Sequence, residues 1–347
     1  MAKRKGYRPS ATEKITLQQL AEHVQLTKGT VSAILNESAV AKTIPQRTKD
    51  RVLAAARDLN YRPNFFARNL RAKRTFAVGV ITEEIGDAYG GMVISGIEAV
   101  LSRQKYFFIT AAHRHNLHNL EEYAAFLLAR GVEGIITVDT ILKRTFAVPT
   151  VAVAGHRNLK GVTNITLDHA RAAQLALRHL FDLGHRRIAV LRGQSFSSDA
   201  DDRWNAICDA AQGLGICIPD ELVLALDSDD PSPEMGYRLT KQLLTRGHFT
   251  ALFAYNDTSA IGAIRAVRET GLRVPEDISV VGFDDIREAA YHLPSLTTVR
   301  QPLRKMGEIA AQTLVDRIAG RVNHSSPILI EPELVVREST AQAAARK

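Results

Sequence analysis

The sequence predicts an all-α helix-turn-helix head followed by an α/β body made of two doubly wound parallel-sheet lobes. Three observations indicate this fold class. Residues 1–74 hold 16 Lys and Arg against 5 Asp and Glu, so basic charge is concentrated at one end of the 347-residue chain. The same segment has the apolar periodicity of short helices. From residue 76 onward, short apolar runs alternate with amphipathic helices in two cycles, which is typical of parallel sheets covered on both faces.

Composition excludes several classes of protein. The chain is 45% hydrophobic and 24% charged, as expected of a folded globular protein. No apolar run reaches the ~18 residues of a membrane span, and no apolar stretch follows the charged N-terminus, so we expect neither a membrane partner nor a secretory signal. Two cysteines, Cys208 and Cys217, exclude a disulfide framework and indicate a reducing cytoplasm.

The distribution of charge predicts a nucleic-acid partner. The net charge is +8, but the head has a balance of +11 and the remainder −3. Concentrated positive charge is typical of a surface that binds phosphates. A basic tail without structure is the alternative, and the helical pattern of the head argues against it.

Two short helices and a tight turn are expected in the head. Thr16 and Gln19 form a capping-box pair at the start of the first helix. Thr27 is the expected N-cap of the second helix, which buries Val31 and Ile34. The turn between them lies at about 25–26. This is the helix-turn-helix arrangement, in which the second helix enters the major groove of DNA.

A third helix and a short linker complete the head. The third helix is expected over about 45–59, with Val52 and Leu59 on its buried face, and Pro63 ends it. Residues 64–71 have apolar groups at helical spacing, but so short a helix is marginal alone in water. We therefore expect this segment to become ordered on contact with a partner, the alternative being an unstructured linker.

The body is expected to contain two sets of alternating strands and helices. The expected strands are 77–81, 107–110, 134–138, 150–153, 188–191, 251–254 and 278–281, and the expected helices are 90–104, 117–130, 168–183, one from about 202, 233–246 and 258–270. Ligands of such folds bind beyond the carboxyl ends of the strands, so a cleft between the lobes is the expected binding site.

Several runs of residues resemble the LacI/GalR family of bacterial transcription regulators. They are Thr16-Leu17-x-x-Leu20-Ala21-x-x-Val24, Thr27-x-x-Thr30-Val31-Ser32, Leu35-Asn36, Leu59-Asn60-Tyr61-x-Pro63-Asn64, Leu183-Gly184-His185-Arg186-Arg187-Ile188, Asn256-Asp257-x-x-Ala260-x-Gly262 and Gly282-Phe283-Asp284-Asp285. The resemblance covers nearly the whole chain. It implies a homodimer, or a tetramer, on a near-palindromic operator, with a hinge helix in the minor groove where Leu70 kinks the DNA. It also implies a body like the type I periplasmic-binding proteins, with three crossings between lobes.

We expect the chain to divide into three functional parts and a tail. They are a helix-turn-helix DNA-binding domain over 1–62, a hinge helix and linker over 63–74, an effector-binding and dimerisation domain over 75–340, and a tail over 341–347. Within the third part, lobe 1 is expected at about 75–164 and 299–324, and lobe 2 at about 165–298 and 325–340.

The second helix is expected to read base edges through its first residues, since these lie deepest in the groove. Lys28, Gly29 and Ser32 are the base-reading candidates, and Thr30 would hold a phosphate. Ala33 departs from the family, many members of which carry a long polar residue there, often Arg. The DNA-binding residues, several of them implied by the resemblance alone, are Thr16, Leu17, Thr27, Lys28, Gly29, Thr30, Ser32, Ala33, Asn36, Tyr61, Asn64, Ala67, Arg68 and Leu70.

Effector-binding candidates follow the strands of both lobes. In lobe 2 they are Arg203, Asn256 and Asp284, whose donors and acceptors match the vicinal hydroxyls of a sugar or nucleoside; the resemblance implies effector contact there. In lobe 1 they are Asp87, Tyr89, His113 and Asp139, with His156 as a further polar contact. The alternative is that Asn256 and Asp284 only cap helices, that Tyr89 packs on its own lobe and that His156 is a solvated loop residue.

Departures from the family make a simple hexose effector doubtful. Ala154-Gly155-His156 stands where the family often has an acid, and Ala88 stands where it usually has a proline.

The head also departs from the family. A longer loop, 38–45, precedes the third helix, and Ile44 is expected to fill the apolar position just before that helix.

The sequence does not indicate catalysis, a cofactor or a metal. The adjacent acids Asp201-Asp202 and Asp284-Asp285 would point in different directions, and no nucleophile or phosphate-loop motif is present. The histidines of loop 113–118 lack the accompanying ligands of a metal site.

We therefore expect a cytoplasmic, nucleoid-associated transcription regulator that acts as a repressor. Its operator affinity is expected to depend on a small polar ligand, a sugar or a sugar-like molecule. The alternatives are a solute-binding protein of transport type and, less favoured, a sugar-processing enzyme. The absence of a signal peptide and the basic head argue against the first, and the missing catalytic set against the second.

Overall fold

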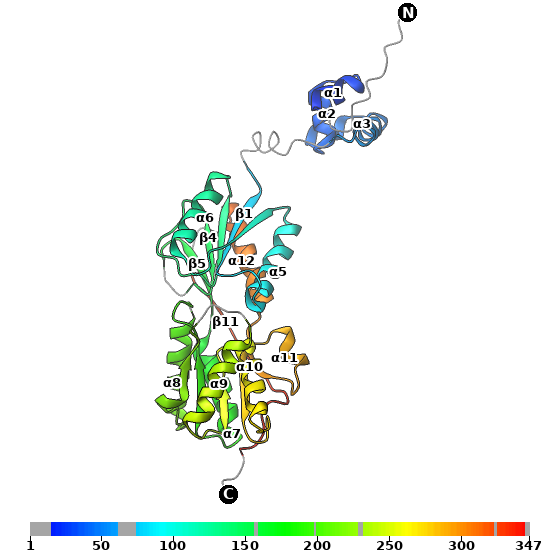
Figure 1. Cartoon of the computed structure of the whole chain (residues 1–347). Helices are drawn as coiled ribbons and strands as arrows, with labels where there is room; N and C mark the ends of the chain where they lie inside the picture. The colour runs from blue at the N-terminus through cyan, green and yellow to red at the C-terminus, as the bar shows by residue number, and fades with distance from the viewer. Residues whose placement is uncertain are drawn as a thin grey trace, which may run out of the picture. The chain divides into compact units, whose positions relative to one another are not determined.

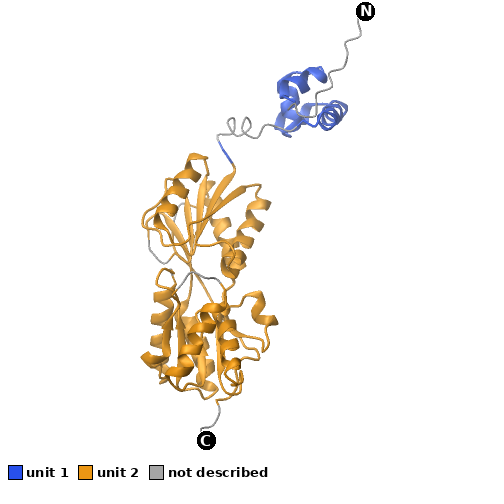
Figure 2. Ribbon diagram, viewed as in Figure 1, with its two compact units in different colours: residues 1–75 blue, residues 76–347 orange. Residues whose placement is uncertain are grey.

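The computed structural model describes residues 15–61, 74–155, 159–197, 199–227, 232–322 and 325–343, and the chain forms two compact units, residues 1–75 and 76–347 (Figure 2). In the first unit, α1 (Leu17–His23), α2 (Lys28–Leu35) and α3 (Gln46–Asp58) enclose a small apolar core. Leu20 and Val52 are fully buried in it. The three predicted helices are confirmed.

The helices α1 and α2 of the head begin where nearby side chains cap them. The Gln19 amide donates to Thr16 Oγ1 at 3.3 Å, and the Thr16 amide donates to Gln19 Oε1 at 2.8 Å, which is the expected capping box. The Thr30 amide donates to Thr27 Oγ1 at 3.1 Å. The long loop before α3 contains a 3₁₀ helix, η1 (Ala39–Thr43), and Ile44 packs against the core as expected.

The second unit contains two six-stranded sheets (Figure 1). The strands of the first sheet are β1 (Ala77–Thr82), β2 (Phe107–Ala112), β3 (Gly134–Val138), β4 (Thr150–Val153), β5 (Val162–Leu167) and β11 (Ile328–Ile330), in the order β11-β5-β4-β3-β1-β2 and all parallel. Helices α5 (Ala88–Arg103) and α12 (Leu303–Ile318) cover one face, and α6 (Leu117–Ala129) covers the other. We call this part lobe 1.

The second sheet belongs to lobe 2. Its strands are β6 (Ile188–Arg192), β7 (Val223–Ala225), β8 (Ala251–Phe253), β9 (Ser279–Asp284), β10 (Thr297–Arg300) and β12 (Glu333–Val335), in the order β12-β10-β9-β8-β6-β7. Only β12 is antiparallel to its neighbour. Helices α7 (His169–Asp182) and α8 (Ala200–Leu214) cover one face, and α9 (Glu234–Arg246) and α10 (Asp257–Glu269) the other. The short helices η2 (Asp220–Leu222) and α11 (Arg287–Tyr291) lie in connections.

The predicted doubly wound fold is confirmed, but the crossings lie later than expected. The chain passes from lobe 1 to lobe 2 after β5, returns after β10 and passes again after β11. The expected boundaries near 164, 298 and 324 are therefore corrected to about 168, 301 and 331. The reason is that β5, β10, β11 and β12 were not expected as strands: β10, β11 and β12 have only three or four residues, and β5 contains the polar residues Thr163, Asn164 and Thr166, so sheet pairing rather than local pattern forms them.

Small residues let two helix pairs approach closely. A Cβ atom on Gly96 of α5 would lie 2.0 Å from the Arg304 carbonyl oxygen of α12, and one on Gly307 of α12 would lie 2.0 Å from the Val93 carbonyl oxygen. Gly236 of α9 and Gly262 of α10 make the equivalent approach in lobe 2. Larger side chains there would separate the helices and deform the lobes. Among the described residues, no helix combines the length and apolar composition of a membrane span.

Candidate functional site

The start of α2 presents the predicted base-reading residues on the surface of the head. Thr27, Lys28 and Gly29 are exposed, while Val31 and Ile34 on the opposite face are buried. A Cβ atom on Gly29 would meet only Thr27 Oγ1, at 3.7 Å, so nothing in the head requires glycine at this position. A helix N-terminus also attracts phosphate through its free amide groups. This surface is suited to lie against a nucleic acid.

The other predicted DNA-binding residues have mixed environments. Thr30, Ser32 and Ala33 are half-buried on α2, and the Asn36 side-chain amide donates to the Ser32 carbonyl oxygen at 2.8 Å. Thr16 is exposed, and Leu17 and Tyr61 pack on the core of the head, where burial raises the pKa of Tyr61. Asn64, Ala67, Arg68 and Leu70 lie outside the described residues.

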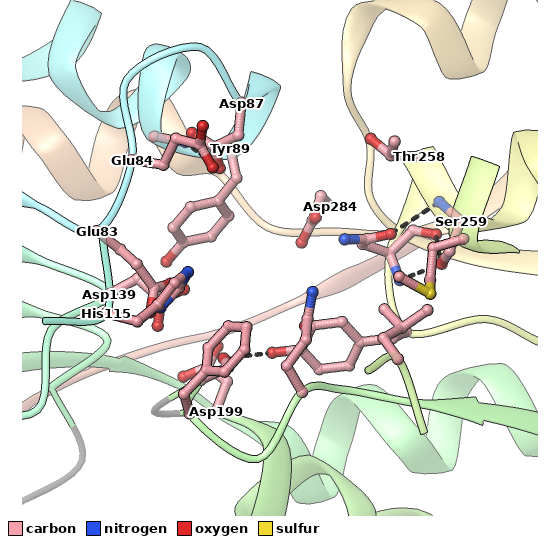
Figure 3. Close-up of a pocket in the computed structure, with 18 of the residues that line it drawn as sticks. Glu83, Glu84, Asp87, Tyr89, His115, Asp139, Asp199, Thr258, Ser259 and Asp284 are labelled. Atoms are coloured by element: carbon pink, nitrogen blue, oxygen red, sulfur yellow. Dashed lines mark hydrogen bonds and ion pairs between the residues drawn. The ribbon is translucent and has the colours of Figure 1, made fainter. Parts of the chain in front are cut away.

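A cavity of about 110 Å³ lies between lobe 1 and lobe 2 at the carboxyl ends of the strands (Figure 3). The structure brings six of the eight predicted effector residues into its lining: Asp87, Tyr89, Asp139, Arg203, Asn256 and Asp284. Residues at or after the ends of β1, β2 and β3 form the lobe 1 wall, and residues that follow β6, β7 and β8 or end β9 form the lobe 2 wall. The expected cleft site is therefore present as a cavity.

Arg203 is held rigidly in the lobe 2 wall. Its Nη1 donates to the Tyr255 carbonyl oxygen at 2.6 Å, and its Nη2 lies 3.1 Å from Asp199 Oδ2. The guanidinium lies 3.7 Å from the centre of the Phe283 ring and 4.4 Å from that of Tyr255. Burial alone would lower the pKa of Arg203, but Tyr255 and Asp199 reverse this and raise it. The side chain is a fixed cation with only 4% exposure.

Asp284 ends β9 and points into the cavity (Figure 3). Its Oδ1 accepts a hydrogen bond of 2.6 Å from Gln301 Nε2. Burial raises the pKa of Asp284 to about 7, although Arg203 and Gln301 oppose the rise. Its φ of 105° lies in the region that disfavours side chains, and such strain concentrates at functional sites.

Asn256 and Asp87 cap helices as well as lining the cavity. The Ser259 amide donates to Asn256 Oδ1 at 2.8 Å, and Ser259 Oγ returns a hydrogen bond to the Asn256 carbonyl oxygen. Both Asp87 oxygens accept from the Gly90 amide, at 3.1 and 3.2 Å, at the start of α5. The capping interpretation of Asn256 is therefore confirmed, and its position in the lining keeps it a candidate for ligand contact.

Of the two histidine predictions, the one for His113 is not supported by its position, and the one for His156 is not tested. His113 lies outside the lining, because its ring is buried at 4% exposure and its Nε2 lies 3.0 Å from Thr140 Oγ1. Burial lowers the pKa of His113 to about 4. Instead, His115 lines the cavity, contacting Glu83 and lying with its ring centroid 3.7 Å from that of Phe196 of lobe 2. His156 lies outside the described residues.

Several lining residues were not predicted from the sequence. Glu83, Phe196, Ser197, Asp199 and Tyr255 contribute side chains from loops that follow β1, β6 and β8. Ser197 Oγ lies 2.6 Å from the Tyr255 hydroxyl across two of these loops. Asp199 could have been found, since it precedes Arg203 by four positions, the spacing of a helical ion pair. The others have no local signal.

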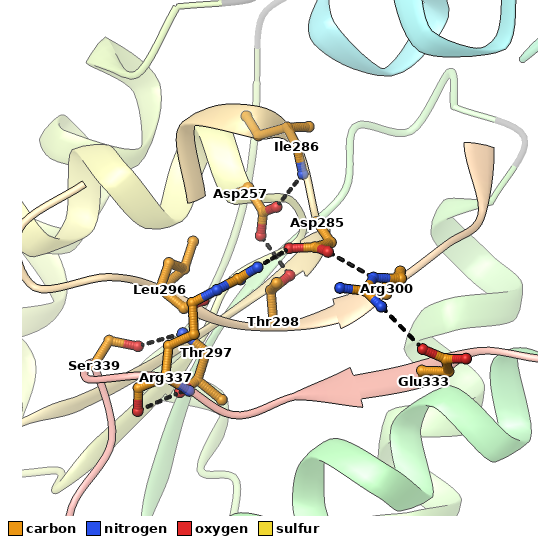
Figure 4. Close-up of polar contacts among 10 residues, drawn as sticks. All are labelled: Asp257, Asp285, Ile286, Leu296, Thr297, Thr298, Arg300, Glu333, Arg337 and Ser339. Carbon is orange, nitrogen blue, oxygen red and sulfur yellow. Dashed lines mark hydrogen bonds and ion pairs between the residues drawn. The ribbon is translucent and has the colours of Figure 1, made fainter. Parts of the chain in front are cut away.

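A network beside the site fixes the end of β9 (Figure 4). Asp285 Oδ2 accepts from Arg300 Nε at 2.7 Å, and Asp285 Oδ1 accepts from Arg337 Nη2 at 2.6 Å. Arg300 Nη1 also reaches Glu333 Oε2 at 3.1 Å. The network joins β9, β10 and the segment that contains β12. The end of β10 and the start of β12 adjoin two of the three crossings between the lobes. It holds Asp285 at a φ of 57° and so orients the adjacent Asp284.

Both units of the chain are similar to known protein families. Residues 16–64 match the family described as "Bacterial regulatory proteins, lacI family", and residues 177–340 match the "Periplasmic binding protein-like domain". The HTH-type transcriptional repressor PurR of Yersinia pestis bv. Antiqua is 32% identical over 336 residues, which cover 94% of this chain and 97% of that protein. The PurR of Yersinia enterocolitica serotype O:8 is similar to the same extent.

Solved structures resemble the whole chain. A Lac repressor dimer bound to operator and the anti-inducer ONPF has a TM-score of 0.82 and 26% identity, over 95% of this chain and 100% of that one. A complex of the transcriptional regulator CelR with cellobiose has a TM-score of 0.69 and 28% identity, over 94% and 100%. Fold, motifs and overall similarity agree: the chain belongs to the lacI family of bacterial regulatory proteins.

Proposed function

We propose that the protein is a sequence-specific DNA-binding repressor whose operator affinity is set by a small polar ligand in the cavity between its lobes. The observation that carries the proposal is the pairing of two sites in one chain. One is the exposed start of α2 on a basic head, and the other is a polar cavity lined by both lobes. A ligand that contacts both walls favours one lobe angle, and a different lobe angle changes operator affinity.

The repressor acts as a homodimer in the cytoplasm, on the nucleoid, and carries out no catalysis. Three features support this. The Lac repressor relative is a dimer on operator DNA. The PurR relatives are transcriptional repressors. Asp87, Asp199 and Asp284 are held by a helix cap, an ion pair and Gln301, respectively, rather than arranged as an acid and base around a nucleophile.

Selection from a random DNA pool at several salt concentrations tests DNA recognition. We expect a two-fold symmetric consensus and an affinity that falls steeply with salt, because Lys and Arg release counterions from the phosphates. Lys28→Ala should relax selection at one position per half-site and weaken binding by about 1–3 kcal/mol. Lys143→Ala, an exposed lysine of the body, is the matched control and should change neither. A transport-type solute-binding protein would give no consensus.

Ligand control is tested on the selected DNA. Asp284→Ala should leave operator affinity within about twofold of the native protein but abolish the response to a ligand that shifts the native protein. Loss of a hydrogen bond to a charged group weakens ligand binding by about 1.5–3 kcal/mol. An unchanged ligand affinity in Asp284→Ala would place the effector elsewhere.

A further inference from the structure

The loop between α2 and α3 departs from the family pattern by its length, and nothing in the proposed function accounts for its extra residues. It spans residues 38–45 and contains η1 (Ala39–Thr43). Loops that a rigid scaffold holds in place often carry binding residues. The conformation of this loop and the side chains that it exposes therefore bear on what the head can bind.

The loop has a defined conformation. The Ala41 amide donates to the Ser38 carbonyl oxygen at 2.8 Å, and the Ile44 amide donates to the Ala41 carbonyl oxygen at 3.2 Å. Ala41 is 6% exposed, and Ile44 packs against the core of the head. These two apolar side chains anchor the loop and determine which of its residues face outward.

The loop presents Lys42 between its two anchors. Val40, Lys42 and Thr43 are exposed, Val40 at 64%. Thr43 Oγ1 donates to the Val40 carbonyl oxygen at 2.8 Å, so this hydroxyl has a partner within the loop. Lys42 forms neither a hydrogen bond nor an ion pair within the part of the head that the structure describes. Its ammonium group is therefore available to an anion outside the protein.

The length of α2 places the loop at the edge of the DNA groove. α2 has eight residues. At about 1.5 Å per residue it is about 12 Å long, and the major groove is about 12 Å wide. The Ser38 amide donates to the Ala33 carbonyl oxygen at 3.1 Å, and η1 lies against α2. When the start of α2 meets the bases, the segment held at its other end lies beside the sugar-phosphate backbone.

A lysine at this edge suits a phosphate better than a base. Its ammonium is a compact point charge on a flexible four-carbon stem, and it binds a phosphate oxygen from many directions. Contacts with phosphates fix the register of a protein on the duplex without carrying sequence information. The chemistry of Lys42 thus complements the DNA backbone next to the bases that α2 reads.

We propose that the extra residues of the loop form a second DNA contact of the head, in which Lys42 binds a backbone phosphate at the edge of the groove that receives α2. The inference rests on the proposed function, since it concerns the same DNA. Each half-site of a symmetric operator then has one additional phosphate contact, which makes two per dimer. The contact strengthens binding and adds no base preference.

The salt dependence of operator binding tests the contact on the full chain. Each phosphate contact contributes about 0.9 to the slope of log affinity against log salt, so Lys42→Gln should reduce its magnitude by about 1.8 per dimer. Affinity at low salt should fall by about threefold or more, with the selected consensus unchanged. Lys42→Arg keeps the charge and should restore the slope. Arg57→Gln removes one charge from the exposed last turn of α3, away from the loop, and is the matched control.

Ethylation interference on the selected operator locates the contact. Ethylation neutralises one phosphate, so the native protein should lose affinity at a symmetric pair of phosphates to which Lys42→Gln is insensitive. An unchanged slope and interference pattern in Lys42→Gln overturn the inference. An altered consensus also overturns it, because Lys42 would then read a base. So do equal losses of slope in Lys42→Gln and Arg57→Gln with the same interference pattern, because net charge alone would explain them.

Selection from a random DNA pool separates this inference from the proposed function. A native protein that selects a symmetric consensus and is indifferent to Lys42→Gln contradicts only the loop contact. A native protein that selects no consensus fails as a repressor.

Discussion

The adjacent acids Asp284 and Asp285 should respond to the same substitution with opposite signs. We predict that Asp284→Asn stabilises the body at pH 8, whereas Asp285→Asn destabilises it. Both changes are nearly isosteric, and Asn tolerates the positive φ of 105° and 57° at these positions better than most residues. The difference comes from their partners. Asp284 is buried and accepts one hydrogen bond from the side-chain amide of Gln301, while Asp285 accepts hydrogen bonds from two arginines.

The magnitude for Asp284 follows from its pKa. Burial raises the pKa from 3.8 to about 7 in the folded protein. Between these values the folded state holds a proton that the unfolded state has lost, so stability falls as pH rises from about 4 to 7 and then levels off. Each pKa unit corresponds to about 1.4 kcal/mol. Removing the acid should therefore raise the free energy of unfolding at pH 8 by up to about 4 kcal/mol and change it little at pH 4.

The magnitude for Asp285 follows from the loss of its ion pairs. Its side chain is 10% exposed, beside Arg337 at 16% and Arg300 at 42%. Breaking a buried pair costs about 3–5 kcal/mol, and exposed pairs contribute at most about 1 kcal/mol. Because Arg300 keeps Glu333 as a second partner, we expect Asp285→Asn to cost about 1–3 kcal/mol at pH 8.

The assay is urea unfolding followed by tryptophan fluorescence at pH 4 and pH 8. The single tryptophan, Trp204, lies on α8 and therefore reports on lobe 2, which contains both acids. Ligand titration of each variant gives the functional readout, and Asp284→Asn should combine higher stability with weaker ligand binding. Destabilisation by Asp284→Asn at pH 8, or an equal effect at pH 4, would contradict the prediction.

The remaining predictions concern glycines and base reading. Gly29→Ala should stabilise the head by up to about 1 kcal/mol, because the added Cβ meets only Thr27 Oγ1 at 3.7 Å, yet weaken operator binding in a mobility-shift assay if α2 lies in the major groove as predicted. Ala33→Arg should shift preference to guanine at one position per half-site, worth about 1–3 kcal/mol, and identical selected sites would contradict it. Gly307→Ala should lower stability in urea by about 1–3 kcal/mol or more, while Gly213→Ala on the exposed face of α8 should not.

Local sequence was sufficient for the elements whose signals are short-range. The capping pairs of Thr16 and Thr27 involve residues three positions apart, so the helices of the head could be predicted from their own residues. The apolar runs of β3 and β4 are buried on both faces of a parallel sheet, which makes them recognisable without knowledge of their neighbours. Asp139, Asn256 and Asp284 could be placed because they lie at or directly after strand ends.

The tertiary structure decided the rest. Strands β11 and β12 have three residues each and form only because β5 and β10 offer them a free edge. His113 and His115 are two positions apart, yet only His115 lines the cavity, and no pattern in the loop distinguishes them. Tyr255 and Phe196 line the cavity because separate loops converge there. The raised pKa of Asp284 also depends on the tertiary structure. Carboxyl groups as far apart in the sequence as Asp87 and Asp284 shift each other's pKa only when folding brings them together and removes water.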